Sequence, residues 1–272
     1  MADVSVETRL HTLAQYIATQ TCREHRGTLK VGVDLGTANI AIVVLDENND
    51  PITGITYPSS VVKDGIVVDY LTATQVVKDL KQQLEDRLGQ ELTHAATAIP
   101  PGISEGNTKV IANVVESSGL IVTHVVDEPV AAASALKIRN GAVVDVGGGT
   151  TGLSILRNGK VIFSADEPTG GTHMTLVLAG ALGIDYADAE LMKRDRLQED
   201  NIFPVVRPVV EKMASLTQGW LASYNVRKIY VVGGASSFSA FPEVFRKTTG
   251  KQIIQSIEPL LVTPLGIAMH AA

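Results

Sequence analysis

The sequence predicts an α/β protein built from two related halves. One unit, an apolar strand ending in aspartate, a glycine-threonine turn and a second apolar strand, occurs at 33–45 and again at 143–156. Short β-branched runs separated by glycine or asparagine are typical of strands joined by hairpins. Elsewhere such runs alternate with helical patterns, which indicates α/β domains. The recurrence about a hundred residues later predicts that the second half repeats the first.

Length and composition describe an ordinary globular chain. The 272 residues can bury a large core, and 45% of them are hydrophobic. The net charge of −6 argues against a nucleic-acid partner or an anionic membrane surface. No apolar run approaches the ~18 residues of a membrane span, and no export signal is visible. Cys22 is the only cysteine, so we expect a cytoplasmic protein without disulfides or stable membrane insertion.

Residues 1–27 are predicted to form an N-terminal amphipathic helix, helical over about 4–24 and closed by Gly27. Its apolar positions recur at helical spacing. They are Val6, Leu10, Leu13, Ala14, Ile17 and Ala18. Two interpretations stay open: a helix packed on its own domain, or a detachable, dispensable helix that docks to a partner or to a bacterial microcompartment.

The next segment, 28–140, is predicted to be the first domain. Glycine, proline and serine punctuate its strands and helices. After the hairpin, its elements are expected at 52–57, 58–62, 76–88, 95–99, 104–119 and 121–126, with a helix from Pro129.

The segment 141–258 is predicted to be the second domain, and a helix within 259–272 is expected to return to the first domain. After the hairpin and a strand at 161–165, the expected elements lie at 171–182, 187–193, 203–224, 228–232, 241–247 and 253–254, with the terminal helix at 265–272. Pro204 and Pro208 are expected within the first turns of the helix at 203–224, where proline is tolerated.

The two hairpins predict a phosphate site. Glycine lets backbone approach a ligand closely, and N–H groups of successive turn residues form an anion-binding concavity. Asp34 and Asp145, at the strand ends, would repel a bare phosphate, so a cation or a bound water is needed between each carboxylate and the phosphate. Mg²⁺ binds through one or two carboxylates, waters and substrate phosphates. Two facing hairpins could therefore clamp a polyphosphate and its metal.

Residues 147–152 also match the dinucleotide-binding pattern G-x-G-x-x-G. That pattern must begin a helix after its strand. Residues 153–156 instead continue as a strand, which excludes a Rossmann site. For either hairpin alone an ordinary glycine turn is the simpler interpretation, and their pairing favours phosphate.

Five motifs now stand in order along the chain. They are 34–37 (DLGT), 127–133 (DEPVAAA), 145–151 (DVGGGTT), 231–237 (VVGGASS) and 263–268 (TPLGIA). This order resembles the actin-like ATPase superfamily, in particular Hsp70 chaperones and bacterial MreB, from Lys30 onward. Residues 64–70, 170–171 and 189–193 strengthen the resemblance. Within the superfamily, the whole chain is most similar to the ethanolamine-utilisation J proteins, described as chaperonin-like.

The resemblance implies a duplicated ribonuclease H-like fold, with two domains around a nucleotide cleft that holds ATP or ADP with Mg²⁺. Asp34 and Asp145 would hold Mg²⁺ through its waters, and Glu128 would orient the attacking water. The residues implied to contact nucleotide fall into three groups. Gly36, Thr37 and Ala38 would bind the β-phosphate side, Gly147, Gly148, Gly149 and Thr150 the γ side, and Gly233, Gly234, Ser237, Glu190 and Lys193 the adenosine.

Two departures from the family pattern matter. An acidic residue usually stands at the position of Gly152, so its loss weakens the expected metal and water network. The link at 62–72 is too short for the Hsp70 subdomain that carries a cleft lysine, and 193–203 is similarly trimmed. We therefore expect reduced peripheral subdomains and a shallow nucleotide pocket.

The resemblance implies a slow ATPase that acts as a chaperone or an assembly or reactivation factor, with an ethanolamine-pathway enzyme or a microcompartment component as partner. Three alternatives stay open: an MreB-like filament protein, a nucleotide-binding scaffold without hydrolysis, and a small-molecule kinase. The trimmed subdomains argue against the filament protein, because those subdomains normally supply the filament contacts. The sequence shows no inserted substrate-binding region, which argues against the kinase.

Overall fold

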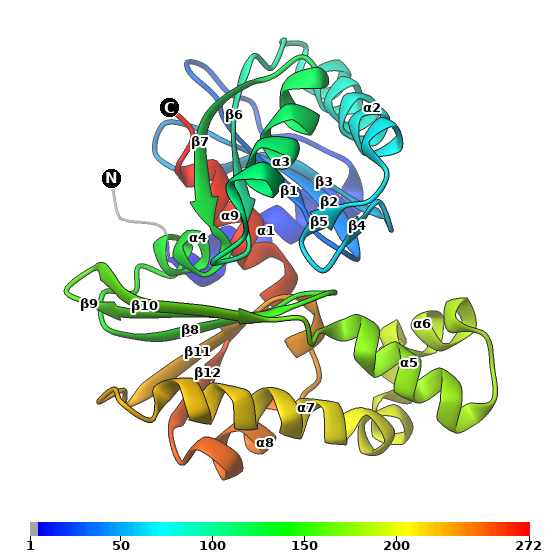
Figure 1. The fold of residues 1–272 in the computed structure, drawn as a ribbon. Helices are drawn as coiled ribbons and strands as arrows, with labels where there is room; N and C mark the ends of the chain where they lie inside the picture. The colour runs from blue at the N-terminus through cyan, green and yellow to red at the C-terminus, as the bar shows by residue number, and fades with distance from the viewer. Residues whose placement is uncertain (1–4) are drawn as a thin grey trace.

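The computed structural model describes residues 5–272, which form two domains, each a sheet with helices, one above the other in Figure 1. The first sheet has the strand order β3-β2-β1-β6-β7. Its strands are β1 (Lys30–Leu35), β2 (Asn39–Leu45), β3 (Pro51–Pro58), β6 (His94–Ile99) and β7 (Ile121–Asp127). The first three pair antiparallel, whereas β1, β6 and β7 pair parallel.

The second sheet repeats this arrangement with the order β10-β9-β8-β11-β12. Its strands are β8 (Gly141–Val146), β9 (Thr151–Arg157), β10 (Lys160–Glu167), β11 (Lys228–Val232) and β12 (Gln252–Gln255). Again three antiparallel strands are followed by two parallel ones. The predicted duplication of the hairpin unit is therefore confirmed at the level of whole sheets.

Two helices and a small hairpin follow the first three strands of the first domain. Helices α2 (Tyr70–Leu88) and α3 (Glu105–Ser117) begin after the side-chain caps Asp69 and Ser104. Strands β4 (Val62–Lys63) and β5 (Ile66–Val67) pair with each other alone. The prediction of a strand at 58–62 was largely wrong. Strand β3 continues to Pro58, and the N–H of the next residue, Ser59, donates to the Ala38 carbonyl.

The second domain contains the helices α5 (Gly171–Leu182), α6 (Tyr186–Arg194), α7 (Glu199–Leu221) and α8 (Phe241–Thr249). Helices α7 and α8 lie below the second sheet in Figure 1, and α5 and α6 pack against each other and α7 at its side. Helix α7 begins four residues before its predicted start, so Pro208 lies in its third turn. The expectation that both prolines sit in the first turns was wrong. Pro204 and Pro208 lie on the exposed face, where water can bond the carbonyls that proline leaves without an N–H donor.

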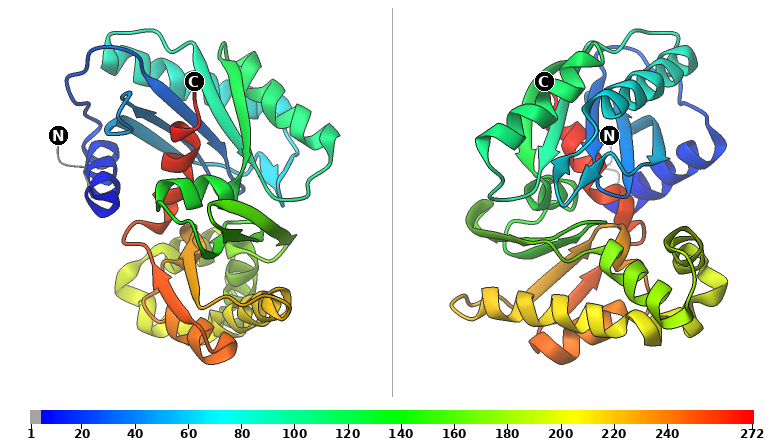
Figure 2. Two further views of the ribbon diagram at one scale, coloured as in Figure 1. Left: turned by 90° about the vertical axis from the view of Figure 1, so that its left-hand side faces the viewer. Right: turned by 45° about the vertical axis from the view of Figure 1, so that its right-hand side comes forward.

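Helices α4 (Glu128–Ala135) and α9 (Pro259–Met269) cross between the domains (Figure 2). A Cβ on Gly266 would overlap the carbonyl oxygen of Ala131, so only glycine permits this approach. Helix α9 begins six residues before the predicted position, despite Pro264 in its interior. Its residues 261–268 are buried, and this tertiary packing outweighs the low helix propensity of proline.

Helix α1 (Val6–Thr19) begins after Ser5, whose hydroxyl accepts a hydrogen bond from the Thr8 N–H. It ends at Gln20 in the left-handed conformation, not at Gly27 as predicted. The predicted start at residue 4 lies outside the described residues. Leu10 and Leu13 are fully buried, and a Cβ on Gly54 of β3 would lie 2.9 Å from Leu13 Cδ1. The helix packed on its own domain is the arrangement in this structure, and its docking to a partner or a microcompartment stays a prediction.

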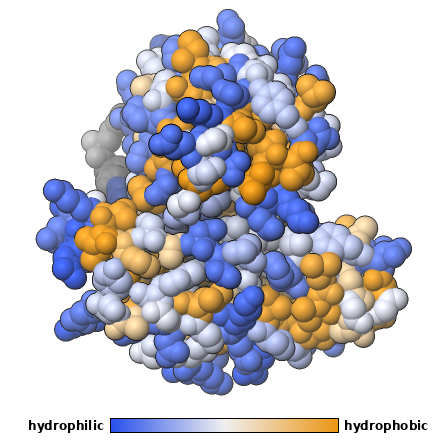
Figure 3. All heavy atoms as spheres, viewed as in Figure 1, coloured by the Kyte–Doolittle hydropathy of each residue, from blue (hydrophilic) through white to orange (hydrophobic). Residues whose placement is uncertain are grey.

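Within residues 5–272, no helix has both the length and the apolar composition needed to cross a lipid bilayer. Polar and apolar side chains are mixed over the face shown in Figure 3, and apolar side chains gather around α5 and α6 at its lower right. Exposed large apolar residues of these two helices are Leu176, Val177 and Leu182 of α5 and Leu191 of α6.

Replacing Leu13 by alanine tests the role of α1. Because this buried side chain fits against β3, we expect Leu13→Ala to lower the free energy of unfolding by about 2–5 kcal/mol in urea titrations. Gln15→Ala, on the exposed face of the same helix, should change it by less than about 0.5 kcal/mol. Equal effects from both variants would show that α1 contributes nothing specific to the core.

Candidate functional site

A cleft of about 300 Å³ lies between the two domains. This volume is at the lower end of the range for small-molecule pockets, about 300–1,000 Å³. Every site residue predicted from the sequence lines the cleft. They are Asp34, Gly36, Thr37, Ala38, Glu128, Asp145, Gly147, Gly148, Gly149, Thr150, Glu190, Lys193, Gly233, Gly234 and Ser237. Residues from opposite ends of the chain therefore share one cavity.

The tips of the two hairpins touch each other across this cleft. A Cβ on Gly148 would lie 2.7 Å from the Cβ of Ala38, and one on Gly149 would lie 2.6 Å from the Thr37 hydroxyl. Real Cβ atoms do not approach other atoms so closely, so side chains at these positions would force the tips apart. The two glycines allow one backbone turn to rest directly on the other.

The start of α5 holds the second hairpin loop in shape. The N–H groups of Gly171 and Thr172 donate to the carbonyls of Gly147 and Gly148, at 2.9 and 2.7 Å. These bonds use the carbonyl oxygens of the loop. Among the hydrogen bonds of residues 5–272, none uses the N–H of Gly148 or Gly149. Those two donors remain available to an anion in the cleft.

Three carboxyl groups gather behind the hairpin tips: Asp34 near the end of β1, Asp145 near the end of β8, and Glu128 at the start of α4. Burial and the neighbouring charge of Asp145 raise the pKa of Asp34 to about 7. Burial also raises the pKa of Asp145 to about 6, although a hydrogen bond from the Thr263 hydroxyl opposes the change. The pKa of Glu128 lies well above its ordinary value because of burial and the charges of Asp145 and Asp34.

These carboxyl groups fit a hydrated divalent cation shared with a ligand. Among residues 5–272, no ion pair joins Asp34, Asp145 or Glu128 to a basic side chain. Nor does this part of the chain contain three acidic, histidine or cysteine residues placed to enclose a metal. A cation here would take its other ligands from water and phosphate, which is how Mg²⁺ usually binds in nucleotide sites.

The opposite wall of the cleft carries Glu190 and Lys193. The Lys193 ammonium donates to the Glu190 carboxylate and to the Thr175 hydroxyl, both at 2.7 Å. Burial lowers the pKa of Lys193, and Glu190 partly offsets this change. For Glu190, burial acts to raise the pKa, but Lys193, together with hydrogen bonds from Thr175 and Arg194, more than compensates and the net change is downward. The pair faces the cleft and also fastens α6 to α5.

Gly233 and Gly234 follow β11 and line the cleft together with Ser237. Gly233 adopts φ +87°, and its N–H donates to the Pro259 carbonyl at 2.8 Å. A Cβ on Gly233 would overlap Asp145, so this turn leaves room for the carboxylate. The Arg196 guanidinium donates to the carbonyl of Ser237.

Several lining residues were missed from the sequence. Arg194, Arg196 and Glu199 line the cleft, although the segment 193–203 was expected only to be trimmed. Two arginines, Arg194 and Arg196, follow the motif at 189–193 closely, and this position was the sequence signal that could have placed them at the cleft. Thr263 lies in a recognised motif, but its bond to Asp145 depends on a helix that returns from the end of the chain.

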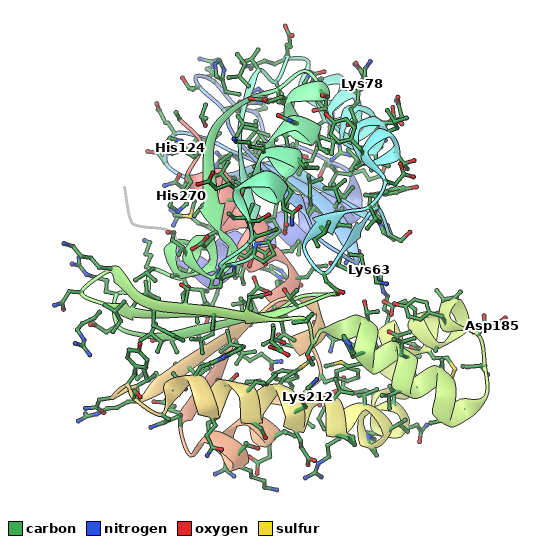
Figure 4. The ribbon with its side chains drawn as sticks, viewed as in Figure 1. Lys63, Lys78, His124, Asp185, Lys212 and His270 are labelled. Atoms are coloured by element: carbon green, nitrogen blue, oxygen red, sulfur yellow. The ribbon has the colours of Figure 1, made fainter. Side chains whose placement is uncertain are left out.

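The histidines take no part in the cleft. His124 and His270 lie together on the outer edge of the first domain, as Figure 4 shows. His270 Nε2 lies 2.9 Å from the Ser134 hydroxyl and so links α9 to α4. Burial and His124 lower the pKa of His270. His270 therefore has a structural role at this edge of the first domain.

The duplicated sheets, with a cleft between two glycine hairpins, define an actin-like ATPase fold. A family model described as MreB/Mbl protein matches residues 53–179, and one described as Type IV pilus assembly protein PilM matches residues 125–261. The chain belongs to the family of the ethanolamine utilization protein EutJ. It is 40% identical to EutJ of Escherichia coli (strain K12), over 96% of this chain and 92% of that one.

Solved structures agree. The crystal structure of EutJ from Carboxydothermus hydrogenoformans matches with a TM-score of 0.92 and 47% identity over 97% of both chains. MreB5 of Spiroplasma citri bound to ADP matches with a TM-score of 0.70 and 17% identity, over 88% of this chain and 94% of that one, which shows the fold alone. The predicted Hsp70 likeness is also present: HscA homolog of Burkholderia thailandensis is 25% identical over 76% of this chain and 42% of its own length.

The raised pKa values predict how stability depends on pH without a divalent cation. The folded state keeps a proton on Asp145 that the unfolded state releases, so the free energy of unfolding should fall as pH rises from about 4 to above 6. For Asp145 alone the loss is about 3 kcal/mol. Asp145→Asn should remove that part of the slope in urea titrations with a chelator, whereas the exposed Asp188→Asn should not. A slope unchanged by Asp145→Asn would contradict this account.

Proposed function

We propose that the chain binds ATP or ADP with Mg²⁺ in the cleft and hydrolyses ATP slowly, as an assembly, reactivation or chaperone factor in ethanolamine utilisation. The observation that carries the proposal is the contact between two glycine hairpin tips from opposite domains. Each has an aspartate behind it, Asp145 buried and Asp34 half-buried. One tip alone would be an ordinary turn. Two tips that share a cleft provide backbone donors on both sides of a polyphosphate.

The phosphates would lie between Gly36–Ala38 and Gly147–Thr150. Free N–H groups at Gly148 and Gly149 support this placement, because backbone donors in a turn bind anions. The fold agrees, since the MreB5 structure that it resembles is bound to ADP. The tips touch in the present structure, so a phosphate entering between them would have to part the two domains. Helices α4 and α9, which cross at Gly266, form the hinge for such a movement.

Bound Mg²⁺ would neutralise phosphate charge. Asp34 and Asp145 would accept hydrogen bonds from its waters, and the charge would favour the ionised form of both carboxyls. Thr263 would keep the Asp145 carboxylate oriented through its present hydrogen bond. Glu128 would orient the water whose oxygen bonds to the γ-phosphorus as the bond to the β–γ bridging oxygen breaks. ADP, phosphate and a proton would leave, and the catalysis required of the protein is chiefly positioning.

The proposed role of this chain in ethanolamine utilisation is based on its membership of the EutJ family. An exposed apolar surface around α5 and α6 supports a protein partner, because large exposed apolar patches usually mark interaction sites. We expect that partner to be an enzyme of ethanolamine breakdown or a microcompartment component. In this proposal, nucleotide exchange changes the angle between the domains and so changes the surface offered to the partner.

Calorimetric titration with ADP and ATP in Mg²⁺, paired with phosphate release, tests the proposal. We expect saturable binding and slow release in the unaltered chain. Asp145→Asn should weaken Mg²⁺-dependent ADP binding by about tenfold or more, which is about 1.4 kcal/mol. It should also reduce release by about a hundredfold, because the water and metal network loses a charge. Asp188→Asn is the matched control and should behave like the unaltered chain.

The alternatives give different results in the same experiments. Binding without release would indicate a nucleotide-binding scaffold, and no binding would overturn the proposed site. Sedimentation that depends on ATP would favour the filament protein. Phosphate release that requires a small-molecule acceptor would favour the kinase.

A further inference from the structure

Gly152 stands between two aspartates in one row of the second sheet. On one side the register pairs it with Asp145 of β8, and on the other with Asp166 of β10. Residues directly opposite each other on neighbouring strands share a face, with Cβ atoms about 5 Å apart. The side chain of Asp166 therefore stands on the same face as that of Asp145, which lines the cleft.

A β-bulge produces this alignment. The pairing of β9 with β10 shifts between Val161 and Phe163, and only after that shift does Asp166 face Gly152. Without the extra residue, Ala165 would occupy the place opposite Gly152 and Asp166 would move to the other face of the sheet. The bulge thus aims a carboxylate toward the cleft side.

The space above Gly152 is already occupied by this carboxylate. A Cβ on Gly152 would lie 3.2 Å from Asp166 Oδ1 and 3.4 Å from atoms of Pro101 and Pro129. Pro101 follows β6 and Pro129 follows Glu128, so the carboxylate is enclosed partly by the first domain. An aspartate at position 152 would compete for the place that Asp166 fills.

One oxygen of this carboxylate lacks a partner. Asp166 Oδ1 is buried and accepts no hydrogen bond from any residue in 5–272. Buried polar atoms are nearly always hydrogen-bonded, so such an atom points to a bound water or ligand. Burial raises the pKa of Asp166 to about 7, and the charges of Asp145 and Glu167 add to the effect, while the Thr150 hydroxyl opposes it. Asp166 in turn contributes to the raised pKa of Glu128.

We propose that Asp166 is a positioning residue for hydrolysis, supplying from β10 the carboxylate that the chain lacks at Gly152. Its unpartnered oxygen accepts a hydrogen bond from the water that Glu128 and Asp145 also contact, and so holds that water in line with the γ-phosphate. This inference rests on the nucleotide function proposed above. In this inference, the carboxylate that usually stands at position 152 of β9 is supplied instead by the neighbouring strand β10.

Asp166→Asn tests this assignment without changing the size of the side chain. We expect ATP hydrolysis to fall by about 10- to 100-fold, because the water is no longer held by a charged acceptor. The affinity for Mg²⁺·ADP should stay within about threefold, since the ground-state contacts remain. Binding of ADP with aluminium fluoride, which mimics the transferred phosphoryl group, should weaken by at least tenfold. Glu167→Gln, the next carboxyl on β10, is the matched control and should alter none of these values.

Moving the carboxylate back separates positioning from folding. Asp166→Gly alone should resemble Asp166→Asn, and Gly152→Asp alone should crowd three carboxyl groups into one row. The double variant Gly152→Asp with Asp166→Gly restores one carboxylate above the same spot, and it should recover at least tenfold of the lost hydrolysis. A merely structural role for Asp166 would give no such rescue.

The outcomes distinguish this inference from the function on which it depends. If the unaltered chain binds no nucleotide, the proposed function fails. If it binds ADP but neither hydrolyses ATP nor binds ADP more tightly with aluminium fluoride, the assignment of Asp166 fails while the site stands. The assignment also fails if Asp166→Asn hydrolyses ATP at the unaltered rate, or loses ADP binding to the same degree as hydrolysis.

Discussion

The crossing of α4 and α9 is the contact on which the rest of the structure depends. At Gly266 the backbone of α9 lies so close to the Ala131 carbonyl that no side chain fits between them. A similar approach brings Ala268 onto Gly32 of β1. Close packing of small residues at these two places leaves little freedom for α9 to slide, so in the proposed function the domains would rotate about the crossing. Such a rotation would change the width of the cleft without rebuilding either core.

The same helix also reaches the candidate site. Near its start, the Pro259 carbonyl holds the Gly233 turn and the Thr263 hydroxyl bonds to Asp145. Three residues further along, Gly266 forms the crossing. A ligand that changes the charge or position of Asp145 would therefore act on α9, the helix proposed to form part of the hinge. In the proposed function, α9 would connect nucleotide and cation binding to the angle between the domains, because it contacts both the site and the crossing.

Turn chemistry explains why much of the site was predictable. The motifs at Gly36 and Gly147–Thr150 are local patterns, so the sequence alone predicted the hairpins and the aspartates behind them. Asp166 could not be found in this way, since its position opposite Gly152 depends on a bulge near Phe163 and on pairing between strands. Tertiary packing likewise determines where α7 and α9 begin. Each helix starts earlier than the local pattern predicts and continues through an interior proline, Pro208 in α7 and Pro264 in α9.

The most direct test of the central claim is a crystal structure of the chain grown with ADP and Mg²⁺. The account predicts the diphosphate between Gly36–Ala38 and Gly147–Thr150, with the cation near Asp34 and Asp145 and the two hairpin tips no longer touching. A nucleotide bound elsewhere would contradict it. So would phosphates in the cleft with Gly148 still resting on Ala38, because the clamp requires the ligand to lie between the tips.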